Sequence, residues 1–420
     1  MAFLPSLPLF LYTKSSSVVC GLAVVYLCLV RSLRWRRYNV IHKKYSAKFR
    51  AKSLTPEEAQ DVIQLSYNWD MPFLSEYSLA FALFKTYGIP SISQLLLSTK
   101  QLASQALVAK RYADTEILIG HWLACPLAGR SVDAHPGAPA DDPRASIALA
   151  RVNWLHSKYK ISNEDYLYTL GLFTFEPEAW AVRYGWRPLS PLERYATFVY
   201  WTEIGRKMDI KNIPSTPEEF RLWLRAYEEE HMIPAESNRD VAKHTMDELL
   251  FMVPQTFGMR SFAEGVTRSL LDDRTRIAMM QPEAPSYAKY LVSGLLGLFS
   301  FTQCYLLLPR RKPFAVVRVD LPKIGPSEFA PRLRPSKYTS KPWYKPRSRG
   351  LGMLLDRFLV FIGMHDDIPR LEYKSEGYRI HEVGPLRFEA EGHEEVMQMA
   401  AKLQGCPIAA AWKPPKAAAA

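Results

Sequence analysis

The chain has 420 residues, of which 48% are hydrophobic, 12% aromatic and 23% charged, enough for a large buried core in one or two domains. The formal net charge is +12, and residues 31–50 alone hold eight basic side chains and no acidic one, with a second basic stretch at 310–349. The five cysteines are scattered and form no CxxC or Cys/His spacing, which argues against a disulfide framework or a zinc module and fits a reducing compartment.

The first predicted element is a membrane anchor within residues 1–35. Val18–Val30 contains no polar group other than the Tyr26 hydroxyl and two thiols. Because a span needs about 20 residues, the flanks of this run have to contribute. A cleaved signal peptide is the alternative, but it requires small residues where this chain has arginines. The basic cluster directly after the apolar run predicts a cytosolic location for the rest of the chain. The alternative is that the cluster only makes this surface soluble. Residues 36–54 are interpreted as a basic juxtamembrane linker.

Helix signals dominate residues 55–310, which we predict to form a mainly α core. N-cap residues followed by proline, or by Glu or Gln three positions later, mark helix starts. Such starts are expected at Thr55, Ser91, Ser190 and within Ser215–Glu219. Helices are predicted at 107–125, 144–159, 163–175 and 178–184, with a loop rich in Pro, Gly, Ala and Asp at 126–143. No run shows the period-2 alternation of a strand.

Residues 290–308 form a nineteen-residue segment without a charge. We expect a helix buried in the core, because glycines and polar residues dilute its apolar character. A second transmembrane span and a monotopic patch at the membrane surface are the alternatives.

Residues 311–412 are interpreted as a C-terminal segment that wraps the same domain. Its first part is rich in proline and basic residues, and 351–364 is predicted to be an apolar helix. Residues 378–388 alternate loosely and predict a short hairpin strand. The tail at 413–420 is expected to be disordered.

The candidates for chemistry are few, because the sequence lacks a Gly-rich phosphate loop, GxSxG and HExxH. His156 lies on the predicted helix 144–159 and shares a stripe with Leu149, Val152 and Asn153. A histidine on an apolar face needs a partner. The residues alone favour a hydrogen-bonded core histidine over a metal or haem ligand.

Arg111 and Thr115 are four residues apart and therefore face the same way, with Asp114 beside them. Leu118 and Trp122 extend this face, which predicts a polar group of side chains in an aromatic-lined pocket. A surface pair between Arg111 and Asp114 is the alternative. Arg239 lies in a further polar stretch, of a kind that more often serves packing and capping, and is kept as a candidate cofactor-binding residue.

Several segments in a fixed order resemble the fungal membrane-bound oxygenases of the MpaB family. The resemblance covers residues 75–395 and is carried by KRYADT at 110–115, by 151–159 with 163–173, by WTEIGRKMDI at 201–210, by 232–245, by Trp343-Tyr344 and by 377–385. No single block would suffice. Their agreement in order makes the match specific.

The resemblance implies a fold and a site, because this family is related to the bacterial latex clearing proteins (rubber oxygenases), which are haem b dioxygenases with a globin-like helical core. It implies His156 as proximal iron ligand, Arg111 and Thr115 as distal residues, and Asp114 and Asn153 close by. Two positions depart from the bacterial pattern: Asn153 replaces an arginine and Asp114 replaces a distal lysine. Capping of the iron by lysine is therefore not expected.

The resemblance also implies a function. We expect a haem-dependent oxygenase that cleaves a carbon–carbon double bond of a lipophilic prenyl or terpenoid substrate with dioxygen, in secondary metabolism. The implied partners are that substrate, dioxygen and membrane lipid, with no nucleic acid. The expected location is the endoplasmic reticulum membrane, with a single span and a cytosolic catalytic domain. A membrane-tethered helical binding protein, or a haem enzyme carrying out another oxidation, remain alternatives.

Overall fold

The computed structural model describes residues 9–101, 105–130, 142–250, 253, 258–322, 330–338, 341–362, 365 and 367–413, with backbone only at 9–16 and 105–106. Most of the predicted loop at 126–143, and the predicted disordered tail beyond residue 413, lie outside these residues. The described residues form helices and no β-strand, apart from two isolated bridges, Val317 with Pro335 and Leu333 with Tyr378. The mainly α class is confirmed.

The helices are described in three groups along the chain. The first group is α1 (Leu9–Arg50), α2 (Pro56–Gln64), the π-helical turn η1 (Leu65–Asp70), α3 (Pro72–Thr86), α4 (Pro90–Ser98) and α5 (Gln105–Ala124). The second group is α6 (Arg144–His156), α7 (Asn163–Tyr184), α8 (Pro191–Lys207), α9 (Pro217–His231) and α10 (Glu236–Leu249). The third group is α11 (Met259–Leu270), α12 (Asp273–Ala278), α13 (Ser286–Phe301), η3 (Thr302–Leu306), α14 (Leu351–Phe361) and α15 (His393–Gln404).

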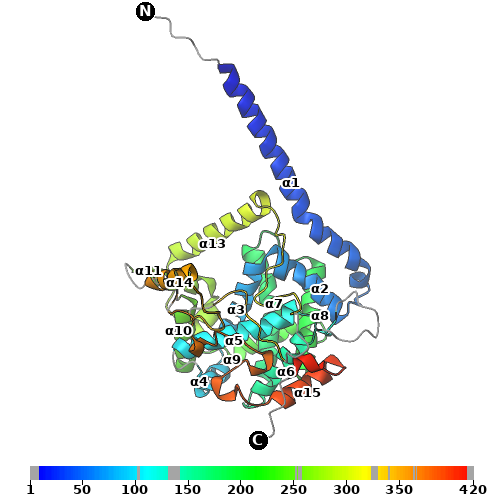
Figure 1. Cartoon of the computed structure of the whole chain (residues 1–420), viewed down its shortest axis with the longest axis vertical. Coiled ribbons are helices and arrows are strands. Elements are labelled where there is room, and N and C mark those ends of the chain that lie inside the picture. The colour runs from blue at the N-terminus through cyan, green and yellow to red at the C-terminus, as the bar shows by residue number, and fades with distance from the viewer. Residues whose placement is uncertain are drawn as a thin grey trace, which may run out of the picture.

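A single long helix, α1, leaves the helical body and carries the apolar N-terminal run away from it (Figure 1). Its side chains from Val18 to Leu29 are exposed, and within the described residues it is the one helix long and apolar enough to cross a membrane. Residues 36–50, interpreted from the sequence as a linker, continue the same helix. No glycine or proline interrupts them, so nothing in this stretch favours a break.

Three of the four predicted helix starts are confirmed as capping boxes, at Thr55 with Glu58, Ser190 with Glu193 and Thr216 with Glu219. The predicted box at Ser91 is wrong. Helix α4 begins one residue earlier at Pro90, with Ile89 as an N-cap that has no side-chain hydrogen bond. The Ser91 hydroxyl instead donates to the Asp165 carboxylate at 2.8 Å, because a partner on another helix competes for it.

The two helices predicted at 163–175 and 178–184 form one helix, α7, with Pro177 inside it. Proline removes a backbone donor and disfavours a helix interior. Here α7 packs along α3 and buries residues on both sides of the proline, including Phe175 and Trp180. Tertiary packing therefore overrides the local preference.

The expectation that residues 290–308 are buried in the core is wrong. Helix α13 and η3 lie on the surface, with Tyr290 80% and Leu298 60% exposed, while Ala288, Val292 and Ser300 face the body. The composition of this segment did not show whether its apolar side chains are buried in the protein core or exposed on the protein surface.

The C-terminal segment returns across the body and fixes one side of it. Arg151, completely buried on α6, donates to the carbonyl oxygens of Val383, Phe388 and Glu391 at 2.7–2.8 Å. Helix α15 packs on α6 as well. The hairpin strand predicted at 378–388 is wrong, because this stretch forms the 3₁₀ turns Ile380–Glu382 and Leu386–Phe388. Gly384, with φ at +133°, and Pro385 separate the two turns and suit a bend rather than a strand.

Candidate functional site

A cavity of about 380 Å³ lies inside the helical body, within the range of sites that enclose small molecules. Helices α3, α5, α6, α7 and α8 contribute to its wall, together with residues 314–316 and 384–385. Most lining side chains are apolar or aromatic, including Leu79, Leu83, Leu118, Phe173 and Trp201. Such a wall excludes water and strengthens the electrostatic effect of the few polar groups that reach it.

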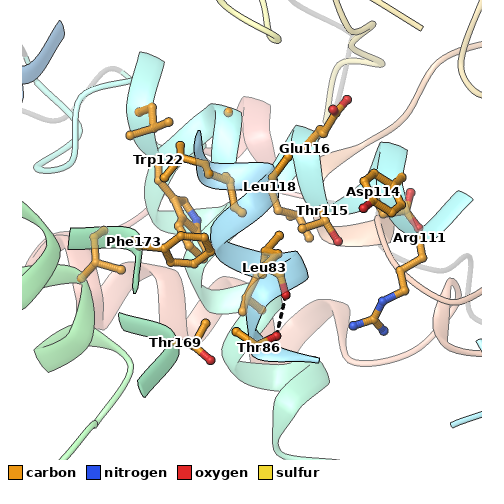
Figure 2. A pocket seen from close by; sticks show the side chains of 18 of the residues that line it. Leu83, Thr86, Arg111, Asp114, Thr115, Glu116, Leu118, Trp122, Thr169 and Phe173 are labelled. Carbon is orange, nitrogen blue, oxygen red and sulfur yellow. Dashed lines mark hydrogen bonds between the residues drawn. The ribbon is translucent and has the colours of Figure 1, made fainter. Parts of the chain in front are cut away.

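Helix α5 supplies the polar side of the cavity (Figure 2). Arg111, Asp114, Thr115, Leu118 and Trp122 all line it. Their spacing of three and four residues places them on one face of the helix. The structure therefore brings the three polar residues expected from KRYADT to the cavity, together with the apolar residues expected beside them.

Arg111 is half-buried and makes no hydrogen bond or ion pair with the part of the chain that the structure describes. The alternative of a surface pair between Arg111 and Asp114 is wrong, since Asp114 is 5% exposed and pairs with Lys110 instead. A guanidinium carries five donors and is always charged. Arg111 thus offers unused donors to whatever occupies the cavity.

Asp114 belongs to a buried network that also holds the C-terminal segment. The Lys110 ammonium donates to Asp114 Oδ2 at 2.7 Å and to the Gly384 carbonyl at 2.7 Å, and the Tyr344 hydroxyl donates to Asp114 Oδ1 at 2.6 Å. Burial raises the pKa of Asp114, against the opposing effect of Lys110. Both carboxylate oxygens are occupied, so Asp114 acts through the residues it positions.

Lys110 and Tyr344 were not among the predicted site residues. Two signals in the sequence pointed to them: Lys110 stands four residues before Asp114 on the same helix, and Tyr344 follows Trp343 in a family block. Their contact joins positions more than two hundred residues apart. Helical periodicity alone cannot predict such a pairing.

His156 is the last residue of α6 and lines the cavity. Its Nδ1 atom is buried, and the ring has no hydrogen-bond partner among the described residues. The ring packs against Tyr166, with 5.5 Å between ring centroids. The alternative of a hydrogen-bonded core histidine therefore does not hold for the described contacts. Because Nδ1 is covered by protein atoms, Nε2 is the ring nitrogen that is left for a ligand.

The protonation state of His156 suits a ligand. Burial, assisted by the positive charge of Arg111, lowers the pKa of His156 to about 4. The imidazole is therefore neutral at pH 7, and a neutral ring is the form that donates a lone pair to a metal. Arg111 and His156 line the same cavity.

Two predicted cofactor-binding residues do not line the cavity. Asn153 donates to the Lys207 carbonyl at 2.9 Å and so ties α6 to α8. Arg239 lies on α10 with its side chain 45% exposed and pairs with Asp240 at 3.2 Å. The hydrogen bond of Asn153 and the ion pair of Arg239 account for these two polar side chains without a cofactor.

The described residues contain no group of three or more His, Cys, Asp or Glu side chains that could together hold a metal ion. Within these residues His156 therefore does not belong to a cluster of metal-ligating side chains.

The family model and the relatives that match this chain agree on one family. The family model described as the catalytic domain of ER-bound oxygenase mpaB/B'/rubber oxygenase matches residues 140–299, which include His156. The chain is 31% identical over 414 residues to ER-bound oxygenase mpaB' of Penicillium brevicompactum, with 93% of each chain covered. It is 34% identical over 285 residues to ER-bound oxygenase mpaB of Penicillium roqueforti, covering 64% of this chain and 91% of that relative.

Proposed function

The chain belongs to the mpaB and rubber oxygenase family and is an oxygenase, and we propose that it binds haem b through His156 and cleaves a carbon–carbon double bond of a lipophilic substrate with dioxygen. The observation that carries this proposal is the neutral, unpartnered imidazole of His156 in the wall of an apolar cavity. The haem assignment also draws on the resemblance of KRYADT and the His156 helix to the haem-binding members of the wider family.

The residues present fit a haem better than a bare iron ion. A haem would bring most ligands of its iron with it, so a single histidine could hold it, and His156 is the one histidine among the described residues that line the cavity. When bound there, the haem iron supplies the site of dioxygen activation. Leu79, Leu118 and Phe173 would surround the macrocycle with apolar contacts and keep water out.

Arg111 and Thr115 supply the hydrogen-bond donors of the proposed reaction. In a dry cavity, fixed donors stabilise negative charge that develops on oxygen more strongly than they would in water. The Arg111 guanidinium has no competing partner in the described structure, and Thr115 lies one turn further along α5. Asp114 binds Lys110, which lines the cavity, and Tyr344, and so ties this part of α5 to the C-terminal segment.

The proposed reaction balances without a further reductant. One molecule of dioxygen adds to the two alkene carbons, the carbon–carbon bond and the oxygen–oxygen bond break, and each carbon leaves as a carbonyl with one oxygen atom. Dioxygen is the oxidant and the alkene is oxidised. An apolar cavity with few polar groups suits a prenyl or terpenoid chain of this kind.

The proposed location is the endoplasmic reticulum membrane, with α1 as a single span and the catalytic body in the cytosol, as part of secondary metabolism. The apolar exposed helix α1 and the arginines that follow it support this orientation. The names of both relatives describe them as ER-bound.

Absorption spectroscopy tests the haem assignment. Full-length protein, expressed with ample haem supply and purified in detergent, is expected to show a Soret band that His156→Ala loses and that added imidazole partly restores. Arg239→Ala is the matched control and should keep the band, because Arg239 lies outside the cavity. A wild-type protein without haem, or an unchanged spectrum in His156→Ala, would refute the proposal.

A further inference from the structure

Helix α13 lies on the side of the body from which α1 departs, and α14 lies at the edge of the body below one end of α13 in this view (Figure 1). Both helices carry large apolar side chains that are exposed. We define the apolar face as the exposed residues Tyr290, Leu291, Leu295, Leu298, Phe301 and Leu306–Leu308 of α13 and its C-terminal extension, with Leu351, Leu354, Leu355, Phe358 and Phe361 of α14. Exposed apolar surface of this extent marks a binding surface for protein or membrane.

Three hydrogen bonds fix the end of α13 to α1. The Tyr26 hydroxyl donates to the Leu306 carbonyl at 2.7 Å, Arg34 to the Leu307 carbonyl at 2.5 Å, and Arg37 to the Arg310 carbonyl at 2.9 Å. Tyr26 lies within the apolar run, which ends at Val30. It precedes Val30 by four residues, or about 6 Å along the helix axis. The apolar face therefore begins beside a part of α1 that is itself apolar.

The direction of α1 relative to the body is also fixed. Trp35 packs edge-on against Trp186 with 5.4 Å between ring centroids, His42 shares a hydrogen bond with the Ser190 hydroxyl at 2.8 Å, and the Tyr45 hydroxyl donates to Asp61 at 2.6 Å. These contacts extend over three turns of the helix. When α1 spans a membrane, they keep the apolar face turned toward it.

The charges around the apolar face favour lipid over a protein partner. Residues 286–312 contain four basic side chains and no acidic one, and residues 341–362 contain five basic side chains and a single acid, Asp356. Asp356 is paired with Lys345 at 2.9 Å. Basic residues next to an apolar surface bind the anionic head groups of a cytosolic leaflet.

We propose that the apolar face lies in the membrane that α1 spans, as a monotopic surface inserted into the leaflet nearest the body. Helices of this type bury their apolar side chains about 5–10 Å into the boundary between head groups and acyl chains. A cavity of about 340 Å³ beneath α13, lined by Leu296 and Phe299, gives an acyl chain room at this surface. The proposal does not depend on haem or on turnover.

Site-specific fluorescence in vesicles tests the proposal with the full chain. Cys20, Cys28, Cys304 and Cys406 are replaced by serine, and one cysteine labelled with an environment-sensitive dye is introduced at Leu298 or Phe358. The control is Leu222 on α9, which is apolar and 65% exposed but outside the apolar face. The protein is reconstituted into vesicles of phosphatidylcholine and phosphatidylserine, with nitroxide-labelled lipid or aqueous iodide as quencher.

Nitroxide lipid is expected to at least halve the fluorescence at Leu298 and Phe358 and to leave Leu222 nearly unchanged, whereas iodide should quench Leu222 most. Equal quenching of all three positions by iodide would overturn the proposal. Protection of Leu298 and Phe358 from both quenchers, with covalent dimers on adding a bifunctional maleimide, would also overturn it and identify a second copy of the chain as the occupant.

Discussion

At the scale of single residues, the proposed site rests on two groups that have no hydrogen-bond partner among the residues that the structure describes. Arg111 offers its donors to the cavity, and His156 offers a neutral ring nitrogen. Sequence reasoning predicted both positions, but the residues alone favoured a structural role for each. The contacts in the structure exclude the structural role expected for Arg111, and the proposed functional roles stay predictions. Lys110 takes the carboxylate that Arg111 was expected to bind, and which neighbour a carboxylate chooses depends on side-chain directions that spacing does not give.

Replacement of Arg111 should separate catalysis from cofactor binding. Arg111→Ala is expected to keep the Soret band but to lower turnover by about 10²–10³-fold, the effect of removing one donor from a site that stabilises developing negative charge. Arg111→Lys should recover part of this loss, since it restores a charge but not the planar donor set. Single-turnover kinetics measure the effect. Wild-type turnover in Arg111→Ala would exclude the proposed role.

The buried histidines make the haem-free protein sensitive to acid. Burial lowers the pKa of His121 to about 3, of His156 to about 4 and of His381 to about 3. As the pH falls below about 6.5, the unfolded chain takes up protons that the folded chain refuses, so stability falls toward the folded-state pKa values. Each histidine contributes about 2 kcal/mol to the loss between pH 7 and pH 5.

His156→Gln should remove one of these contributions. The loss of unfolding free energy between pH 7 and pH 5 is then smaller by about 2 kcal/mol than in the wild type, measured by denaturant titration of the haem-free protein in detergent. The control is His231→Gln on α9, a histidine outside the cavity whose side chain is 44% exposed. If His156→Gln keeps the wild-type pH dependence, the His156 ring of the wild type takes up a proton as readily in the folded chain as in the unfolded chain, and the expectation is wrong.

At the scale of helices, local signals predicted where helices begin better than how they pack. Three capping boxes were confirmed. The hydrogen bonds of a capping box join residues within one four-residue stretch, so the sequence of that stretch is enough to predict them. The continuity of α7 through Pro177 was missed because α3 supplies the stabilising surface. The sequence also did not predict the close approach of α7 and α8, because this approach depends on Gly205 lying opposite Leu170.

Gly205 should therefore tolerate no side chain. A Cβ atom at this position would lie 2.5 Å from Leu170 Cδ2 and 2.9 Å from Ile213 Cδ1, so Gly205→Ala is expected to destabilise the protein by about 1–3 kcal/mol. Gly297→Ala on α13, where nothing lies within 4 Å, should be neutral or stabilising by up to about 1 kcal/mol. Thermal or chemical denaturation compares the two variants. Equal stability would contradict the close contact.

At the scale of the whole molecule, the sequence predicted the helical class, the anchor and a C-terminal segment that returns to the body. It did not predict that α13 and α14 lie on the surface. The reason is physical: protein core and lipid both select apolar residues, so composition is nearly the same for either. Only the arrangement around α1, with its fixed contacts to η3 and α8, distinguishes them.

The orientation of the body is accessible to protease protection. In intact microsomes, protease added from outside is expected to digest a C-terminal epitope tag without detergent, because arginines that follow an apolar span favour a cytosolic location for the residues after them. A luminal marker protein serves as the control for intact membranes. A tag that resists digestion until detergent is added would place the body in the lumen.

The hydrogen bonds between α1 and the carbonyls of residues 306–310 have a consequence for the thickness of the membrane. The run from Ser15 to Val30 has sixteen residues and spans about 24 Å as a helix. Because both its exit point and its direction are fixed, the protein cannot offset hydrophobic mismatch by sliding or retilting the helix alone. A bilayer of about 27 Å, as in the endoplasmic reticulum, matches such a helix more closely than the plasma membrane at about 32 Å. With α1 as the proposed span, the rigid junction would make the length of this helix favour thin membranes over thick ones.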